Sequence, residues 1–158
     1  MRIGQGYDAH QFEEGTDLIL CGVIIDSPAG LKAHSDGDVA IHALCDALLG
    51  AASLGDIGKH FPDSSEHYKN IDSRILLRHV MQLLNDRNLS VHNADITIVA
   101  QTPRLANYID QMCLNMANDL KISETHMNVK ATTTEGMGFE GRKEGISSYA
   151  VVLLNEVL

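Results

Sequence analysis

Residues 33–50, AHSDGDVAIHALCDALLG, place two histidines, three aspartates and a serine at the opening of a predicted amphipathic helix. Ser35 or Asp36 is suited to cap that helix, and Gly37 allows a close approach of the backbone. The unpaired amides of a first helical turn attract anions. The run therefore predicts a helix whose amino end faces a charged ligand, with His34 just before the turn.

His42 lies on the helical face that also carries Asp46 and Leu49, because residues four and seven apart are neighbours. A histidine on a half-apolar face needs a hydrogen-bond partner, and we expect Asp46 to orient its ring. Asp36 and Asp38 are instead expected to be first-turn acids, which the helix dipole favours.

The rest of the chain alternates between strand and helix patterns. Apolar residues that run on or alternate with polar ones predict strands at residues 2–8, 18–20, 23–25, 94–101, 127–134 and 146–154. Apolar stripes predict helices at residues 72–88 and 103–120. This order predicts an α/β (α+β) sandwich, a mixed sheet of four to five strands with three helices on one face, formed by residues 1–158 as a single domain.

The segments between these elements carry turn signals. Cys21 and Gly22 separate two short strands, which predicts a hairpin or a bulged strand that Pro28 and Gly30 close. Residues 54–65, LGDIGKHFPDSS, predict a loop. Asn88 is suited to end the second helix.

Composition excludes several classes of protein. The formal charge of −9 argues against nucleic acid as a partner, because its phosphates would be repelled. No apolar run approaches the ~20 residues that span a bilayer, and the start MRIGQGYDAH lacks the apolar core of a signal peptide. The three cysteines have no CxxC spacing, which argues against a disulfide framework. We expect a protein of the bacterial cytoplasm, or of the plastid stroma after removal of a transit peptide.

Asp8, His10 and His42 offer one carboxylate and two imidazoles, a set that suits Zn²⁺ or a similar divalent cation. In an extended chain, residues two apart project to the same side, so Asp8 and His10 would converge on one point. The alternative is that His42 is a hydrogen-bonded core histidine and that Asp8-x-His10 is a polar turn. Spacing alone leaves both interpretations open.

Residues 132–135, TTTE, follow a predicted strand and precede a glycine-rich segment. Their hydroxyls and carboxylate could hold phosphate oxygens and Mg²⁺, although threonines are also ordinary strand residues. Arg142 and Lys143 could pair with phosphate, although isolated surface cations usually do nothing specific. The GK[ST] ending of a P-loop and the G-x-S-x-G elbow are both absent from the sequence.

Four motifs, in this order along the chain, resemble one family. They are GYDAH at residues 6–10, AHSDGD at 33–38, GDIG at 55–58 with FPD at 61–63, and NVKATTTE at 128–135. The combination of AHSDGD and KATTTE is highly specific, and the resemblance covers essentially the whole chain. On these residues the chain resembles the 2-C-methyl-D-erythritol 2,4-cyclodiphosphate synthases.

The resemblance implies a homotrimer of the non-mevalonate isoprenoid pathway with active sites at its subunit interfaces. It implies a phosphorus–oxygen lyase that cyclises 4-diphosphocytidyl-2-C-methyl-D-erythritol 2-phosphate and releases CMP. Asp8, His10 and His42 would hold zinc or a similar divalent ion. Glu135 would help to hold Mg²⁺ or Mn²⁺ between the phosphates.

The resemblance also implies the substrate contacts. His34 and Thr133 would stabilise the transition state, and Ser35 would contact phosphate. The methylerythritol part would lie against Asp56, Ile57, Gly58, Phe61, Pro62, Asp63, Ser64 and Ser65. The cytidine part would lie in a neighbouring subunit, against Ala100, Gln101, Thr102, Pro103, Arg104, Leu105, Ala106, Ala131 and Thr132. The remaining implied contacts are Asp8, His10, Thr134, Glu135, Phe139 and Arg142.

Phe139 and Arg142 match family positions near the trimer axis, where an apolar cavity would take an isoprenoid diphosphate. Gln5, Tyr7 and Arg104 stand where histidine, phenylalanine and lysine are more frequent. Tyr7 would make that cavity more polar, and Arg104 would keep a cation beside the cytidine phosphates.

Two alternative functions would use the same metal ligands. A zinc-dependent phosphodiesterase would hydrolyse generic phosphodiesters. A non-catalytic carrier of isoprenoid phosphates would use zinc for structure alone.

Overall fold

The computed structural model describes residues 1–157. Its strands are β1 (Arg2–Glu14), β2 (Leu18–Leu20), β3 (Val23–Ile25), β4 (Ala29–Leu31), β5 (Leu89–Val99), β6 (Met127–Thr132) and β7 (Gly145–Glu156). Its α-helices are α1 (Val39–Ala51), α2 (Ile57–His60), α3 (Ser73–Asn85), α4 (Ile109–Leu120) and α5 (Gly138–Gly141). Single 3₁₀ turns lie at Glu66–Tyr68, Ala106–Tyr108 and Glu124–His126.

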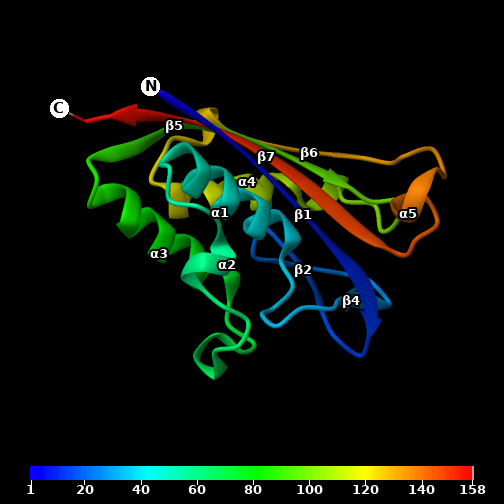
Figure 1. Cartoon of the computed structure of the whole chain (residues 1–158). Coiled ribbons are helices and arrows are strands. Elements are labelled where there is room, and N and C mark those ends of the chain that lie inside the picture. The colour runs from blue at the N-terminus through cyan, green and yellow to red at the C-terminus, as the bar shows by residue number, and fades with distance from the viewer. Residues whose placement is uncertain (158) are drawn as a thin grey trace.

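Five strands form one mixed sheet in the order β4-β1-β7-β5-β6. Strands β5 and β6 are parallel, and the other neighbours are antiparallel. Strands β1 and β7 run side by side over most of their length, so the start of β1 and the end of β7 lie at one end of the sheet (Figure 1). Strands β2 and β3 form a separate hairpin. The predicted mixed α+β sheet and the predicted hairpin are therefore confirmed.

The helices α1, α3 and α4 lie on one face of this sheet (Figure 1). Strand β7 shows the two faces clearly, because Ala150 and Val152 are buried whereas Tyr149 and Val151 are exposed. Successive strand residues point to opposite faces, so the second pair marks a face that α1, α3 and α4 leave uncovered. Helix α5 reaches only its end, where Ser147 Oγ donates to Glu140 at 2.7 Å.

The backbone of helix α1 packs directly against the backbone of β1, because β1 carries two glycines where the helix crosses it. A Cβ atom on Gly4 would lie 1.9 Å from the carbonyl oxygen of Ala47, and one on Gly6 would lie 1.9 Å from that of Ala43. No side chain fits there. The close approach brings α1 directly over the strand that carries Asp8.

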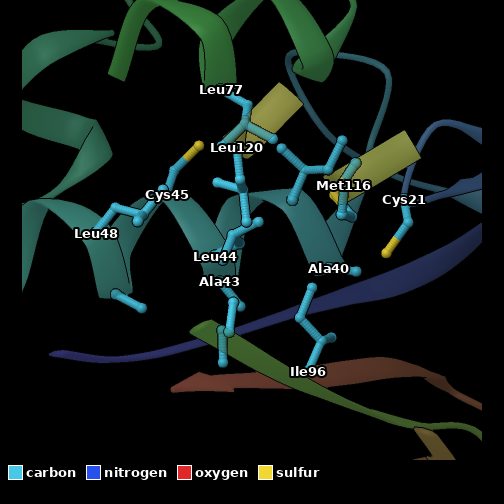
Figure 2. Packing of buried hydrophobic residues seen from close by; sticks show 14 of the residues in the cluster. Cys21, Ala40, Ala43, Leu44, Cys45, Leu48, Leu77, Ile96, Met116 and Leu120 are labelled. Carbon is cyan, nitrogen blue, oxygen red and sulfur yellow. The ribbon is translucent and has the colours of Figure 1, made fainter. Parts of the chain in front are cut away.

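Helix α1 is the centre of the hydrophobic core. Figure 2 shows its side chains between the other helices and the sheet, with labelled contributions from Ala40, Ala43, Leu44, Cys45, Leu48, Leu77, Ile96, Met116 and Leu120. Eleven of its 13 residues are buried. The expectation of an amphipathic helix is therefore wrong: neighbours cover α1 on nearly every side.

Several strands and helices begin or end at other residues than predicted. Strand β1 runs to Glu14 because β7 and β4 pair with it in turn, and the predicted closing segment around Gly30 is itself strand β4. Pro103 lies in a loop, and α4 begins only at Ile109. Helix α3 ends at Asn85, and Asn88 is the left-handed residue that leads into β5.

The other differences between the predicted and the observed elements are smaller. Strand β5 begins earlier than predicted, at Leu89, because it pairs with β7 from there. Strand β6 ends at Thr132, and the segment predicted as a loop contains α2. The cysteines Cys21, Cys45 and Cys113 are all free. Within residues 1–157, no helix is both long and apolar enough to cross a membrane.

Candidate metal centre and substrate cavities

Asp8 and His10 lie in the interior of β1, on the face that α1 covers. Asp8 pairs in register with Ser148 and His10 with Ile146 on β7, so the backbone of both residues is held by the neighbouring strand. The predicted convergence of the two side chains is confirmed, because the nearest atoms, His10 Nε2 and Asp8 Oδ2, are 2.8 Å apart. Their place inside a paired strand makes them rigid.

His42 on α1 completes a cluster with these two residues. Its Nδ1 lies 3.2 Å from Asp8 Oδ2 and 3.1 Å from His10 Nε2. Ligands about 2.0 Å from a tetrahedral Zn²⁺ lie about 3.3 Å from one another, so these separations suit one shared cation. Within the described residues, this is the one group of three or more His, Cys, Asp and Glu side chains that is close enough to hold a metal ion.

The cluster is electrostatically coupled. Burial opposes ionisation of Asp8, but hydrogen bonds from His10 and His42 outweigh it and hold the pKa of this carboxyl far below its usual range. Burial likewise opposes protonation of His42, and the adjoining Asp8 carboxylate outweighs it and raises the pKa of the ring. A partly buried carboxylate that favours a proton on the His42 ring is an arrangement in which a divalent cation could take the place of that proton.

The far side of the His42 ring is held by hydroxyl groups. Its Nε2 lies 3.0 Å from Ser35 Oγ and 3.1 Å from Ser73 Oγ, at the amino end of α3. The prediction that Asp46 orients this ring is wrong. Asp46 Oδ1 accepts a hydrogen bond from the amide of Ile57 at 2.8 Å, because the side chain points to α2.

The amino end of α1 is capped by Asp38, not by Ser35 or Asp36 as predicted. Asp38 is fully buried, and its carboxylate accepts hydrogen bonds from the amides of Ile41, Cys21 and Gly22. The expected role of Asp36 and Asp38 as first-turn acids is also wrong, since both precede the first turn. A carboxylate already occupies the helix end, so it offers no anion site.

A cavity of about 370 Å³, called here the first cavity, opens beside the metal cluster. Its lining joins β1, α1 and the segment around α2, and comprises Asp8, His10, Ala33, His34, Ser35, His42, Ile57, Gly58, Phe61, Asp63, Tyr68, Ile71 and Leu76. His34 Nε2 lies 3.1 Å from the carbonyl oxygen of Ser65, so the 61–65 segment is held against the AHSDGD segment.

A second cavity of about 410 Å³ lies between the β5–α4 segment and the end of β6. It is lined by Ala100, Gln101, Pro103, Arg104, Leu105, Ala106, Ile109, Ala131, Thr132 and Thr133. The two cavities share no lining residue. The structure therefore gathers the predicted site residues into two separate groups.

The remaining predicted residues line neither cavity: they are Asp56, Pro62, Ser64, Ser65, Thr102, Thr134, Glu135, Phe139 and Arg142. Asp56 caps α2 through the amide of Lys59. Glu135 has a left-handed backbone, and its amide donates to Thr133 Oγ1 at 3.2 Å. Arg142, just after α5, pairs with Glu144.

Sequence reasoning missed some of these positions. Tyr68, Ile71 and Leu76 line the first cavity, and Ile109 lines the second, but each is apolar or aromatic and carries no chemical signal. Ser73 was missed for a different reason. A serine next to a helix cap looks like part of the cap, and only the fold brings it to His42.

Comparisons with known proteins show which family the chain is similar to. The model of the family described as the YgbB family matches residues 1–155. A protein of Methylococcus capsulatus, named 2-C-methyl-D-erythritol 2,4-cyclodiphosphate synthase, is 64% identical over 97% of each chain. One of Pseudoalteromonas atlantica with the same name is 58% identical over 99% of this chain and 96% of its own.

Solved structures show the same fold. A 2C-methyl-D-erythritol-2,4-cyclodiphosphate synthase described as its CDP-bound form superposes with a TM-score of 0.90 at 37% identity, over 98% of this chain and 100% of its own. The bifunctional IspDF of Campylobacter jejuni gives a TM-score of 0.93 at 46% identity, and the match covers 97% of this chain but 42% of that longer one.

Proposed function

The chain belongs to the YgbB family, and we propose that it converts 4-diphosphocytidyl-2-C-methyl-D-erythritol 2-phosphate to 2-C-methyl-D-erythritol 2,4-cyclodiphosphate and CMP. This is a phosphorus–oxygen lyase step in non-mevalonate isoprenoid biosynthesis. The observation that carries the proposal is the convergence of Asp8, His10 and His42 at the cavity that the AHSDGD motif lines.

The reaction is an intramolecular phosphoryl transfer. An oxygen of the 2-phosphate forms a bond to the β-phosphorus, the bond from that phosphorus to the bridging oxygen breaks, and the electron pair leaves with CMP. Such a transfer depends chiefly on alignment of the two groups and on neutralisation of their charge. The protein therefore has to position two phosphates and exclude competing water.

Two divalent ions would supply most of the positive charge. Asp8, His10 and His42 would hold one, Zn²⁺ or alternatively Mg²⁺ or Mn²⁺, and Glu135 would help to hold Mg²⁺ or Mn²⁺ with the substrate. Bound there, the ions would polarise phosphate oxygens and offset the charge of −9 on the whole chain.

The chain's own residues fix the phosphates and the sugar. Ser35 accepts from the amide of Gly37 at 3.3 Å and lies 3.0 Å from His42 Nε2, which holds its hydroxyl at the cavity, where it would contact a phosphate oxygen. His34 lies in the same cavity and would stabilise the transition state with Thr133. Methylerythritol would contact residues 56–58 and 61–65, and cytidine residues 100–106 and 131–132.

A homotrimer would join the two cavities. One substrate has to reach both the metal cluster and the cytidine residues, which in one chain lie in cavities without a common wall. The uncovered sheet face supplies an apolar surface for association, with Ile3 exposed by 73% and Tyr149 by 45%. We therefore place each active site between two subunits of a trimer built on this face.

The trimer axis would run along the same sheet face. Phe139 and Arg142 would lie near it and could bind an isoprenoid diphosphate. Tyr7 and Tyr149 pack against each other at a tilt of 50°, with ring centroids 4.9 Å apart on this face, so two phenol groups would make such a cavity more polar. We place the enzyme in the bacterial cytoplasm, as its bacterial relatives suggest, or in the plastid stroma.

The test is product analysis with the purified protein, Zn²⁺ and Mg²⁺. The proposal predicts stoichiometric CMP without inorganic phosphate, and a cyclic diphosphate visible by ³¹P NMR. An uncyclised product or hydrolysis of generic phosphodiesters would identify a phosphodiesterase. Binding of isoprenoid phosphates without any CMP would identify a carrier.

A further inference from the structure

A continuous chain of hydrogen bonds leads away from His42 on the side opposite the metal cluster. His42 Nε2 lies 3.1 Å from Ser73 Oγ, and Ser73 Oγ donates to Asp36 Oδ1 at 2.5 Å. Ser73 is fully buried and His42 is 6% exposed. Solvent therefore cannot substitute for these partners, and each proton in the chain has a defined place.

The directions of these hydrogen bonds follow from Asp36. Its Oδ2 accepts from the Ser73 amide at 3.0 Å, and its Oδ1 accepts from the Asp38 amide at 3.1 Å as well as from Ser73 Oγ. A carboxylate only accepts, so the single hydroxyl proton of Ser73 is committed to Asp36. Ser73 Oγ can then act toward His42 only as an acceptor, which requires a proton on Nε2.

We propose that Ser73 and Asp36 are positioning residues that hold the proton of His42 on Nε2 and so keep the lone pair of Nδ1 for a metal ion. The proposal rests on the proposed function for the need of a metal. It assigns a role in the reaction to Ser73, which lines neither cavity and contacts no substrate group.

Asp8, on the other side of the ring, favours the opposite tautomer, in which the proton is on Nδ1. Asp8 Oδ2 lies 3.2 Å from His42 Nδ1 and would attract a proton there, which would block metal binding at that nitrogen. Ser35 also contacts Nε2, but no carboxylate fixes its proton. The Asp36–Ser73 pair is therefore the group that counters Asp8. Removal of such an outer partner costs about 10–100-fold in metal affinity.

The main experiment compares zinc affinity in Ser73→Ala and in Asp72→Ala by chelator competition. Asp72 is the exposed cap of the same helix, and its Oδ1 accepts from the Arg74 amide at 2.8 Å. Both substitutions loosen the amino end of α3, but only Ser73 contacts His42. We expect about 10–100-fold weaker zinc binding in Ser73→Ala and unchanged binding in Asp72→Ala.

A second measurement reads the proton directly. In ¹⁵N-labelled, metal-free protein at alkaline pH, where His42 is neutral, the wild-type ring should show the Nε2–H tautomer. Ser73→Ala should shift it toward Nδ1–H, and Ser73→Thr, which keeps the hydroxyl, should restore both the tautomer and the affinity.

Wild-type zinc affinity in Ser73→Ala, or an unchanged tautomer in that variant, would overturn the proposal. An equal loss of affinity in both variants would also overturn it, since that loss would come from the helix end. A wild-type chain that binds zinc but releases no CMP would refute the proposed function and leave this inference standing.

Discussion

The carboxylate of Asp46 accepts a hydrogen bond from the amide of Ile57, 2.8 Å away, and this contact attaches α2 to α1. Ile57 and Gly58 line the first cavity at this point. Burial raises the pKa of Asp46 in spite of that hydrogen bond, and Asp56 raises it further. The half-buried carboxyl group thus joins the central helix to the segment proposed to hold methylerythritol.

Asp46→Ala should raise KM for the substrate about tenfold with little change in kcat, because a lost hydrogen bond of about 1.5 kcal/mol frees the 55–58 segment. Steady-state kinetics of CMP release measure this. Asp46→Asn keeps an acceptor oxygen and should stay near wild type. Zinc affinity should not change in either variant. A loss of zinc instead of a rise in KM would show that Asp46 acts on His42 after all.

Sequence patterns predict the metal centre better than its surroundings. The Asp8-x-His10 spacing predicts a shared direction within one strand. That His42 joins this pair is a tertiary contact, which spacing alone left open and which the family resemblance implied. The roles of Asp36, Asp38 and Ser73 depend on which loops meet at the amino ends of α1 and α3. Those contacts are tertiary, and a single sequence contains no period that reports them.

The same limit applies to the fold. The alternating pattern along residues 94–99 predicts a strand even when its pairing partners are not known. In contrast, pairing with β7 extends β1 beyond its predicted end at residue 8 and starts β5 before its predicted start at residue 94. The stretch from Pro103 predicts a helix by its apolar spacing, yet a loop there forms a wall of the second cavity.

Metal binding should weaken as pH falls. Zinc requires neutral His42, and the metal-free ring has a raised pKa beside Asp8, so protons compete with zinc at every pH below that raised pKa. Asp8 has a strongly lowered pKa and stays ionised over this range, so it adds no further dependence. Below the raised pKa of His42, zinc affinity measured by chelator competition should fall about tenfold per pH unit, because that ring must lose one proton. An affinity that is constant from neutral to mildly acidic pH would contradict the assigned ligands.

Gly6→Ala should destabilise the fold and the metal centre together. The new Cβ would lie 1.9 Å from the carbonyl oxygen of Ala43, so α1 would have to move away from β1 and carry His42 with it. We expect a loss of more than about 3 kcal/mol of unfolding free energy, comparable to severe overpacking, and weaker zinc binding. Gly15→Ala is the matched control, because nothing lies within 4 Å of its Cβ and its cost is limited to a left-handed backbone. Chemical denaturation and zinc titration of both variants test this, and equal effects would show that the contact is not tight.

Tyr149→Asp should dissociate the proposed trimer. Tyr149 is 45% exposed on the uncovered sheet face and its ring packs at a tilt against Tyr7, so a carboxylate there would be buried without a partner upon association. Ile75→Asp is the control, since Ile75 is similarly exposed, by 50%, on the outer side of α3. Sedimentation should show a monomer for Tyr149→Asp and a trimer for Ile75→Asp.

The monomer should still bind zinc, because all three ligands belong to one chain. It should release CMP at least about tenfold more slowly, because the second cavity of a neighbouring subunit is missing. A Tyr149→Asp monomer with full activity would show that one chain suffices for the reaction, and a Tyr149→Asp trimer would place the interface elsewhere.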